Sequence, residues 1–168
     1  MLLGGWRSLR ELDLKLILAF GTVSQLGFMA VLVGIGDANV AMAGITMLVA
    51  HALFKASLFM AAGIVDHAAH TRSIRRLSGL GAMMPLTFFI SAVAALSMAG
   101  IPPLGGFISK ELMLEQAAHT RWLGGPDVLG WIVVAATMFS VAYSLRYVFH
   151  VFTGRVETGY PARPHDPG

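Results

Sequence analysis

Charged residues and cysteines are scarce in this sequence, and each scarcity excludes a class of protein. Only 12% of the 168 residues are charged, whereas soluble domains average about 25%. The chain has no cysteine, which excludes a disulfide framework and a cysteine-ligated metal site. Residues 1–6 lack a basic segment and a cleavage site, so no signal peptide is expected there. The composition therefore argues against an ordinary soluble domain.

Signatures of soluble enzymes are missing as well. We find no P-loop, no G-x-G-x-x-G, no nucleophile elbow and no haem-ligand pair at helical spacing. The formal net charge is +3, and the basic residues lie between apolar runs, which is typical of membrane topology rather than of a nucleic-acid surface. Asp66, His67 and His70 suggest a metal site, but no second motif accompanies them, so a solvated loop is favoured. We expect no cofactor, no metal and no nucleic acid.

Long apolar runs are what the sequence has in abundance. Hydrophobic residues make up 56% of the chain, and the mean hydropathy is +0.71. The runs cover residues 14–34, 39–65, 85–101 and 128–152, and a shorter helical segment covers 107–119 after a Pro/Gly-rich break at 100–106. These runs predict an all-α, multi-spanning transmembrane bundle over residues 1–155, followed by a flexible tail at 156–168.

The segment before the first run carries helix-start and topology signals. Ser8 and Glu11 match an S-x-x-E capping box, which predicts a helix that begins near Leu9 and holds Asp13 and Lys15 in its second turn. Anchoring at the membrane interface is the ordinary role of charges in such a place. Arg7 and Arg10 precede the first run, and three arginines at positions 72, 75 and 76 follow the second run, two crossings later. The two basic clusters therefore lie on the same side, which is predicted to be cytoplasmic.

Lys55 is the strongest chemical signal, because it lies near the midpoint of the second apolar run. A lysine at the bilayer centre costs about 2.5–3.5 kcal/mol on insertion scales, and such residues mark ion or proton paths. His51 lies one helical turn earlier on the same face, and imidazole exchanges protons near neutral pH. The pair predicts a proton relay. The alternative is a lysine paired with a carboxylate for structure alone.

Lys110 is the second signal, one turn after the Pro/Gly-rich break. Broken helices at membrane depth are tolerated only where they line a cavity or lie within protein, and transporter sites use them. Glu111 and Glu115 follow on the same segment, and either carboxylate is a possible partner for Lys110 or Lys55 across the bundle. The alternative is an interfacial loop with Lys110 extended to the headgroups.

Three ordered motifs resemble one family. Residues 13–28 resemble the D-x-K-x-x-L-A-x-x-T-x-S-Q-L-G segment of the antiporter-like membrane subunits that respiratory complex I shares with Mrp-type sodium/proton antiporters. Residues 51–59 resemble the H-A-x-F-K-A-x-L-F helix of these subunits, and residues 100–111 resemble their G-x-P-x-x-G-F-x-S-K-E/D segment.

Within this family, the resemblance is to the A subunit of the Mrp antiporters. Residues 63–80, which include Asp66, His67 and the arginine-rich loop, carry it. Ser73 stands where an acidic residue is usual in that pattern. Met47 stands where complex I relatives often carry a further histidine, which shortens the histidine chain in this protein.

The resemblance implies roles for individual residues. Lys55 matches the central channel lysine, and His51 matches its neighbouring relay group. Lys110 matches the lysine on a broken helix that leads toward one membrane face, with Glu111 beside it. Asp13 and Lys15 match a charged pair.

The resemblance also implies an architecture and a function. The family is built from two inverted repeats of five helices with a broken fourth helix, and residues 4–155 resemble the second repeat, so the chain resembles a fragment. We expect a membrane subunit of a monovalent cation (Na⁺)/proton antiporter in a bacterial plasma membrane, with lipid and other antiporter subunits as partners. The alternatives are a proton-pumping subunit of NADH-quinone oxidoreductase and a non-transporting structural fragment.

Overall fold

The computed structural model describes all residues except 120–125, 156–159, 161–163 and 168. The described residues form helices and no named strand, so the predicted all-α class is confirmed. Among these described residues, three helices are long and apolar enough to cross a membrane, and a shorter apolar helix accompanies them. The elements are α1 (Leu2–Arg10), α2 (Leu14–Gly34), α3 (Ala38–Ala69), the 3₁₀ turn η1 (Leu80–Ala82), α4 (Pro85–Ala99), α5 (Gly105–His119) and α6 (Pro126–Phe152).

The start of α2 differs from the sequence prediction. The capping box predicted from Ser8 and Glu11 is wrong. Ser8 lies in the last turn of a separate helix, α1, and Glu11 directly follows that helix. Asp13 is the N-cap of α2, and its carboxylate accepts hydrogen bonds from the main-chain N–H of Lys15 and Leu16 at 2.9 and 3.3 Å. The Ser8 hydroxyl instead donates to the Ile17 carbonyl at 2.8 Å, which joins α1 to α2.

The second span is longer than predicted. Asp37 caps the N-terminus of α3 by accepting from Asn39 and Val40, and the helix runs 32 residues to Ala69, past the expected end at residue 65. At 1.5 Å per residue it is about 48 Å long, which exceeds the hydrocarbon thickness of about 30 Å. One end of α3, with Asp66, therefore extends beyond the apolar layer.

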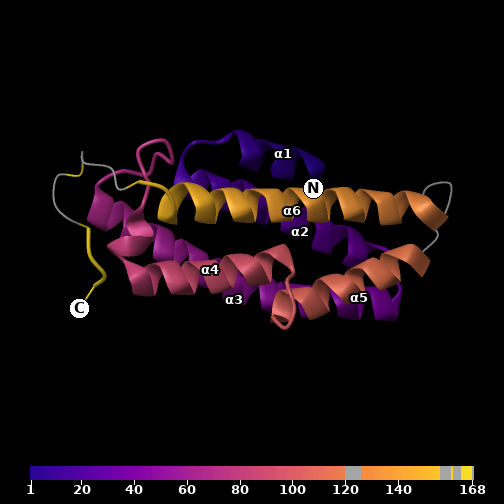
Figure 1. Cartoon of the computed structure of the whole chain (residues 1–168). Coiled ribbons are helices and arrows are strands. Elements are labelled where there is room, and N and C mark those ends of the chain that lie inside the picture. The colour runs from indigo at the N-terminus through magenta and orange to yellow at the C-terminus, as the bar shows by residue number, and fades with distance from the viewer. Residues whose placement is uncertain (120–125, 156–159, 161–163, 168) are drawn as a thin grey trace.

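The predicted break lies between α4 and α5, which follow one another along the long axis of the bundle (Figure 1). Gly100 ends α4 with φ +86°, a conformation that glycine adopts without strain, and its N–H donates to the Leu96 and Ser97 carbonyls. The two half-helices are thus the halves of one interrupted span. If α1 is counted first, this span is the fourth of five.

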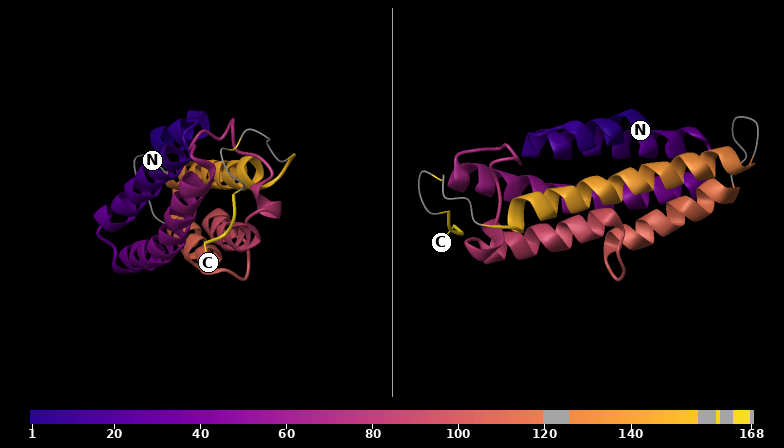
Figure 2. Two further views of the ribbon diagram at one scale, coloured as in Figure 1. Left: turned by 90° about the vertical axis from the view of Figure 1, so that its left-hand side faces the viewer. Right: turned by 45° about the horizontal axis from the view of Figure 1, so that its top comes forward.

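The helices pack as an elongated bundle in which α3 and α6 hold the others together (Figure 2). Helix α3 contacts α2, α4 and α5, while α6 contacts α1, α2, α4 and α5. The outward face of α3 exposes Met42, Ile45, Val49, Leu53 and Met60. A continuous apolar face of this kind suits lipid rather than water, so the exposed surface agrees with a membrane-spanning bundle.

Two described residues of the C-terminal segment contact the loop before η1 and the start of α4. The Tyr160 hydroxyl accepts a hydrogen bond from the Ser78 N–H at 3.1 Å. The Asp166 carboxylate accepts from the N–H groups of Leu86 and Thr87, both at 3.0 Å, and so caps the N-terminus of α4. The rest of the predicted tail lies largely outside the described residues.

Candidate functional site

Lys55 is buried among α2, α3 and α6, with 4% of its surface exposed. Its Nζ donates to the Leu18 carbonyl of α2 at 2.9 Å and lies 5.6 Å from the centroid of the Tyr143 ring on α6. Gly21 leaves room for both groups, since a Cβ there would lie 3.0 Å from Nζ. Within the described part of the chain, no carboxylate forms an ion pair with Lys55.

His51 lies one turn before Lys55 and is equally buried. Its ring packs edge-on against Phe54, with centroids 5.4 Å apart. Its Nε2 has no hydrogen-bond partner among the described residues. An unpaired buried polar atom is costly. A water molecule or a transient proton donor at Nε2 would remove this cost.

Lys110 occupies the break between the two half-helices and has 7% of its surface exposed. Its Nζ donates to the Met98 and Ala99 carbonyls at 2.6 and 3.2 Å and to the Ser140 hydroxyl of α6 at 2.5 Å. The last carbonyls of a helix lack intrahelical donors and carry partial negative charge. The break therefore creates a binding place for the lysine, and the side chain does not extend to the surface as the alternative interpretation required.

Between His51 and the broken helix, α3 presents Met47 rather than a polar side chain. The Ser109 hydroxyl lies 3.2 Å from Met47 Sδ and also contacts the Gly105 and Gly106 carbonyls. A thioether accepts a hydrogen bond weakly and carries no exchangeable proton. The polar face of α3 thus begins at His51.

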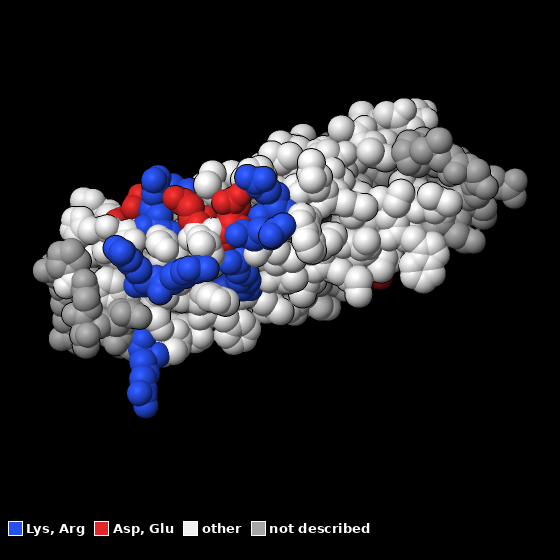
Figure 3. Space-filling view, turned by 90° about the horizontal axis from the view of Figure 1, so that it is seen from above, with Lys and Arg blue, Asp and Glu red and all other residues white. Residues whose placement is uncertain are grey.

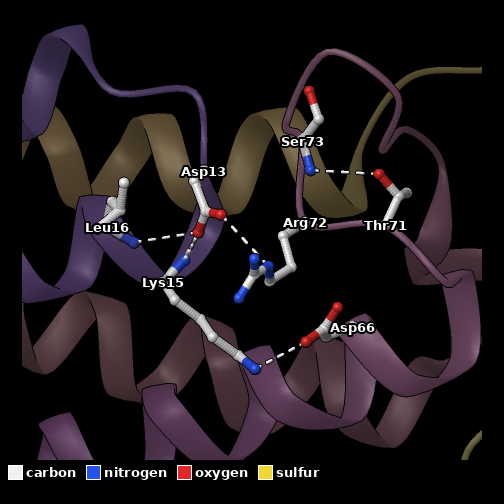
Figure 4. A network of polar contacts seen from close by, with 7 residues as sticks. All are labelled: Asp13, Lys15, Leu16, Asp66, Thr71, Arg72 and Ser73. Carbon is white, nitrogen blue, oxygen red and sulfur yellow. Dashed lines mark hydrogen bonds and ion pairs between the residues drawn. The ribbon is translucent and has the colours of Figure 1, made fainter.

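Asp13 and Lys15 belong to a half-exposed network at the end of the bundle rather than to the buried site (Figure 4). Lys15 Nζ pairs with Asp66 of α3 at 2.7 Å, and Arg72 Nε pairs with Asp13 at 3.3 Å. Asp66 is therefore not part of a solvated loop, since it joins α3 to α2. This geometry matches the anchoring role, and a role in the proton path stays a prediction.

The main chain strengthens the same network. Leu14 N–H donates to the Arg72 carbonyl, and Ile74 N–H donates to the Leu12 carbonyl, both at 2.9 Å. Charged side chains gather over this end of the molecule, while most of the remaining face is uncharged (Figure 3). The clustering agrees with the arginine bias from which the cytoplasmic side was predicted.

Unlike its neighbour Lys110, Glu111 is not buried in the bundle. It is exposed on α5, and among the described residues no ion pair connects it to Lys55 or Lys110. Its place in the path also stays a prediction. In the described ranges, no three acidic or histidine side chains come close enough to hold a metal ion.

Sequence reasoning overlooked the polar face of α6. Ser140, Tyr143, Ser144 and Tyr147 are all buried, and they recur at i, i+3, i+4 and i+7 within an apolar helix. That spacing places them on one face, so the signal was available in the sequence. Ser140 and Tyr143 contact the two lysines directly.

Comparison with known proteins places this geometry in a family. The family model for the transmembrane part of NADH:quinone oxidoreductase and Mrp antiporter subunits matches residues 1–149. The probable K⁺/H⁺ antiporter A/B subunit from Rhizobium meliloti is 45% identical over 99% of this chain and 17% of its own length. The Na⁺/H⁺ antiporter A subunit from Bacillus subtilis is 40% identical over 94% of this chain and 22% of its own length.

Two solved structures share the fold. The Mrp complex from Dietzia sp. matches with a TM-score of 0.81 and 40% identity over 93% of this chain and 18% of that chain. The membrane-bound sulfane sulfur reductase, an archaeal respiratory membrane complex, matches with a TM-score of 0.89 and 28% identity over 98% of this chain and 27% of that chain. This chain spans about a fifth of the length of the curated relatives it matches. The resemblance drawn from the three motifs is confirmed: the chain belongs to the NADH:quinone oxidoreductase/Mrp antiporter family of transmembrane subunits.

Proposed function

We propose that this chain forms part of the proton path in the A subunit of a monovalent cation/proton antiporter of a bacterial plasma membrane. One observation carries the proposal: two buried lysines on different helices are held by main-chain carbonyls and hydroxyls, and no carboxylate pairs with either among the described residues. A lysine paired with a carboxylate is fixed in its charged form. A neutral amine still has N–H groups to donate to a carbonyl, so these lysines keep a partner in both protonation states.

The partners follow from the same proposal. The exposed apolar faces contact lipid. The relatives are named as lettered subunits, A/B in one case and A in the other, which implies further subunits in a complex. The exchanged cation is Na⁺ or K⁺, as the names of those relatives differ on this point. The arginine-rich end faces the cytoplasm.

The test uses a chimeric protein, because the relatives are several times longer than this chain. Residues 1–155 replace the matched segment of the Bacillus subtilis relative, and the assembled complex is studied in everted vesicles of a host that lacks its own antiporters. A fluorescent ΔpH probe reports proton movement when NaCl or KCl is added.

Lys55→Ala is expected to abolish the cation-dependent response, because it removes the amine that carries the proton at this point of the path. Ser57→Ala is the matched control, as Ser57 lies on the same helix but bonds only within it. Membrane content and complex assembly are measured for both variants. Cation-dependent proton flux that persists in Lys55→Ala at normal assembly contradicts the proposal.

A second candidate is a proton path in a respiratory complex, which the TM-score of 0.89 with the sulfane sulfur reductase favours. The same vesicles separate the two functions. An antiporter responds to added Na⁺ or K⁺, whereas a redox-driven pump responds to its electron donor and not to these cations. The non-transporting alternative predicts that no lysine substitution changes flux.

A further inference from the structure

Side chains of helix α6 contact both buried lysines. Its Ser140 hydroxyl accepts a 2.5 Å hydrogen bond from Lys110, and the Tyr143 ring lies 5.6 Å from Lys55. Ser140 and Tyr143 are three positions apart on one helix, so their side chains are neighbours on the same face. One turn of α6 thus connects groups that approach from α3 and α5.

The Tyr143 hydroxyl is the unexplained part of this arrangement. The side chain is fully buried, and its oxygen has no hydrogen-bond partner in the part of the chain that the structure describes. Gln25 of α2 is the polar side chain beside it. A buried hydroxyl that lacks a hydrogen bond is unfavourable, and phenylalanine would fill the same space without that cost. The Tyr147 hydroxyl shares this property, so the feature that distinguishes Tyr143 is its place beside Lys55.

Lys55 and Tyr143 both lie against Gly21, which shows how close they are to each other. A Cβ built on Gly21 would lie 3.0 Å from Lys55 Nζ and 3.1 Å from Tyr143 Cζ, the carbon that bears the hydroxyl. Nζ and Cζ are thus within about 6 Å of each other, a gap that one water molecule bridges. A larger residue than Gly21 would separate them.

The alternative connection along α3 is interrupted. Between His51 and the Ser109–Lys110 pair the helix offers Met47, whose sulfur lies 3.2 Å from the Ser109 hydroxyl. A thioether has no proton to pass on. A proton that leaves Lys55 for Lys110 therefore finds exchangeable protons on α6 and not on this turn of α3.

We propose that Tyr143 and Ser140 form a hydroxyl relay that carries protons between Lys55 and Lys110. This inference rests on the proposed function and deepens it. The ammonium of Lys55 gives one proton toward the Tyr143 hydroxyl, directly or through water. Each hydroxyl accepts a proton and releases its own, and the neutral amine of Lys110 takes the last one. The net change is one proton moved, with both hydroxyls chemically unchanged and their orientation reversed.

The test compares single-atom changes in the chimeric complex. Tyr143→Phe removes the hydroxyl and keeps the ring, and Ser140→Ala removes the other hydroxyl. Each is expected to lower the maximal antiport rate about tenfold or more, in line with the loss of a proton-transferring group, while the cation concentration for half-maximal rate stays unchanged. Ser140→Thr keeps a hydroxyl and is expected to retain the rate. The double variant should be no slower than the slower single variant, because both groups serve one path.

Tyr147→Phe is the matched control. It removes the same atom from the same helix at the same burial, and that hydroxyl is also unpartnered among the described residues, but none of the contacts of Lys55 or Lys110 involves it. Its rate is expected to be unchanged. An equal loss in Tyr147→Phe and Tyr143→Phe would show a general packing effect and overturn the relay.

The lysine variants separate failure of the relay from failure of the proposed function. If Lys55→Ala and Lys110→Ala abolish antiport while Tyr143→Phe and Ser140→Ala keep the normal rate, the relay is wrong and the proposed function stands. If Lys55→Ala retains cation-dependent flux at normal assembly, both are wrong.

Discussion

Gly106 is the position where the structure makes its sharpest steric prediction. It lies at the start of α5, and a Cβ added there would lie 1.8 Å from the Ser97 carbonyl oxygen and 3.0 Å from Ser97 Oγ. The Gly106 N–H also donates to that Oγ at 3.2 Å. The two half-helices of the broken span therefore touch through backbone at this point, and only glycine allows the contact.

The cost of Gly106→Ala follows from these distances. The half-helices must separate by at least about 1.2 Å before the contact reaches 3.0 Å. Such a shift is enough to break the 2.6 Å bond from Lys110 to the Met98 carbonyl, next in the chain to Ser97, because hydrogen bonds fail beyond about 3.6 Å. Overpacking of about 1–3 kcal/mol and one lost bond to a charged group of about 1.5–3 kcal/mol predict a destabilisation of about 2.5–6 kcal/mol.

Gly105→Ala is the control, since nothing lies within 4 Å of a Cβ at this neighbouring position. It is expected to change the free energy of unfolding by no more than about 0.5 kcal/mol. Thermal unfolding of the purified chimeric complex and vesicle antiport are measured for both variants. Gly106→Ala should lower both the unfolding temperature and the flux. Equal behaviour of the two variants would refute the close packing of α4 on α5.

Three further predictions concern the rest of the site. Gly21→Ala is expected to slow antiport with little loss of assembly, because its Cβ would lie 3.0 Å from Lys55 Nζ; an unchanged rate would contradict the described position of the ammonium. The pair Lys15–Asp66 is half-exposed, so a double-mutant cycle on unfolding should give a coupling of about 0.2–1 kcal/mol, and a flux loss without such coupling would instead support a path role. A cysteine at Ser73 should resist an impermeant thiol reagent added outside intact cells, and rapid labelling would reverse the topology.

Sequence reasoning found the spans because long apolar runs have few structural alternatives. It missed α1 because this helix is short and contains Gly4 and Gly5, which disfavour an isolated helix. The structure shows why it forms: a Cβ on Gly4 would lie 2.9 Å from the main chain of Ser24, so α1 packs closely onto α2. Packing against α2 stabilises this helix despite its two glycines.

The lysines were predicted from position, but their partners were not. Carboxylates are the expected partners of a buried lysine, and the sequence offers Glu111 and Glu115. The actual acceptors of Lys55 and Lys110 are mostly main-chain carbonyls, which every residue carries and no sequence distinguishes. Only the Pro/Gly-rich break at residues 100–106 indicates them, since a broken helix leaves carbonyls without donors.

The two lysines are held differently, and the difference follows from the backbone around them. Lys110 has three acceptors, two of them at the end of α4, where intrahelical donors run out. Lys55 has one main-chain acceptor, the Leu18 carbonyl inside the intact helix α2, and shares it with the Thr22 hydroxyl at 2.9 Å. The ammonium of Lys55 therefore loses less when it moves. In a proton path between the two lysines, the helix break holds Lys110 in place. Gly21, which lies opposite Lys55, leaves the Lys55 side chain room to move.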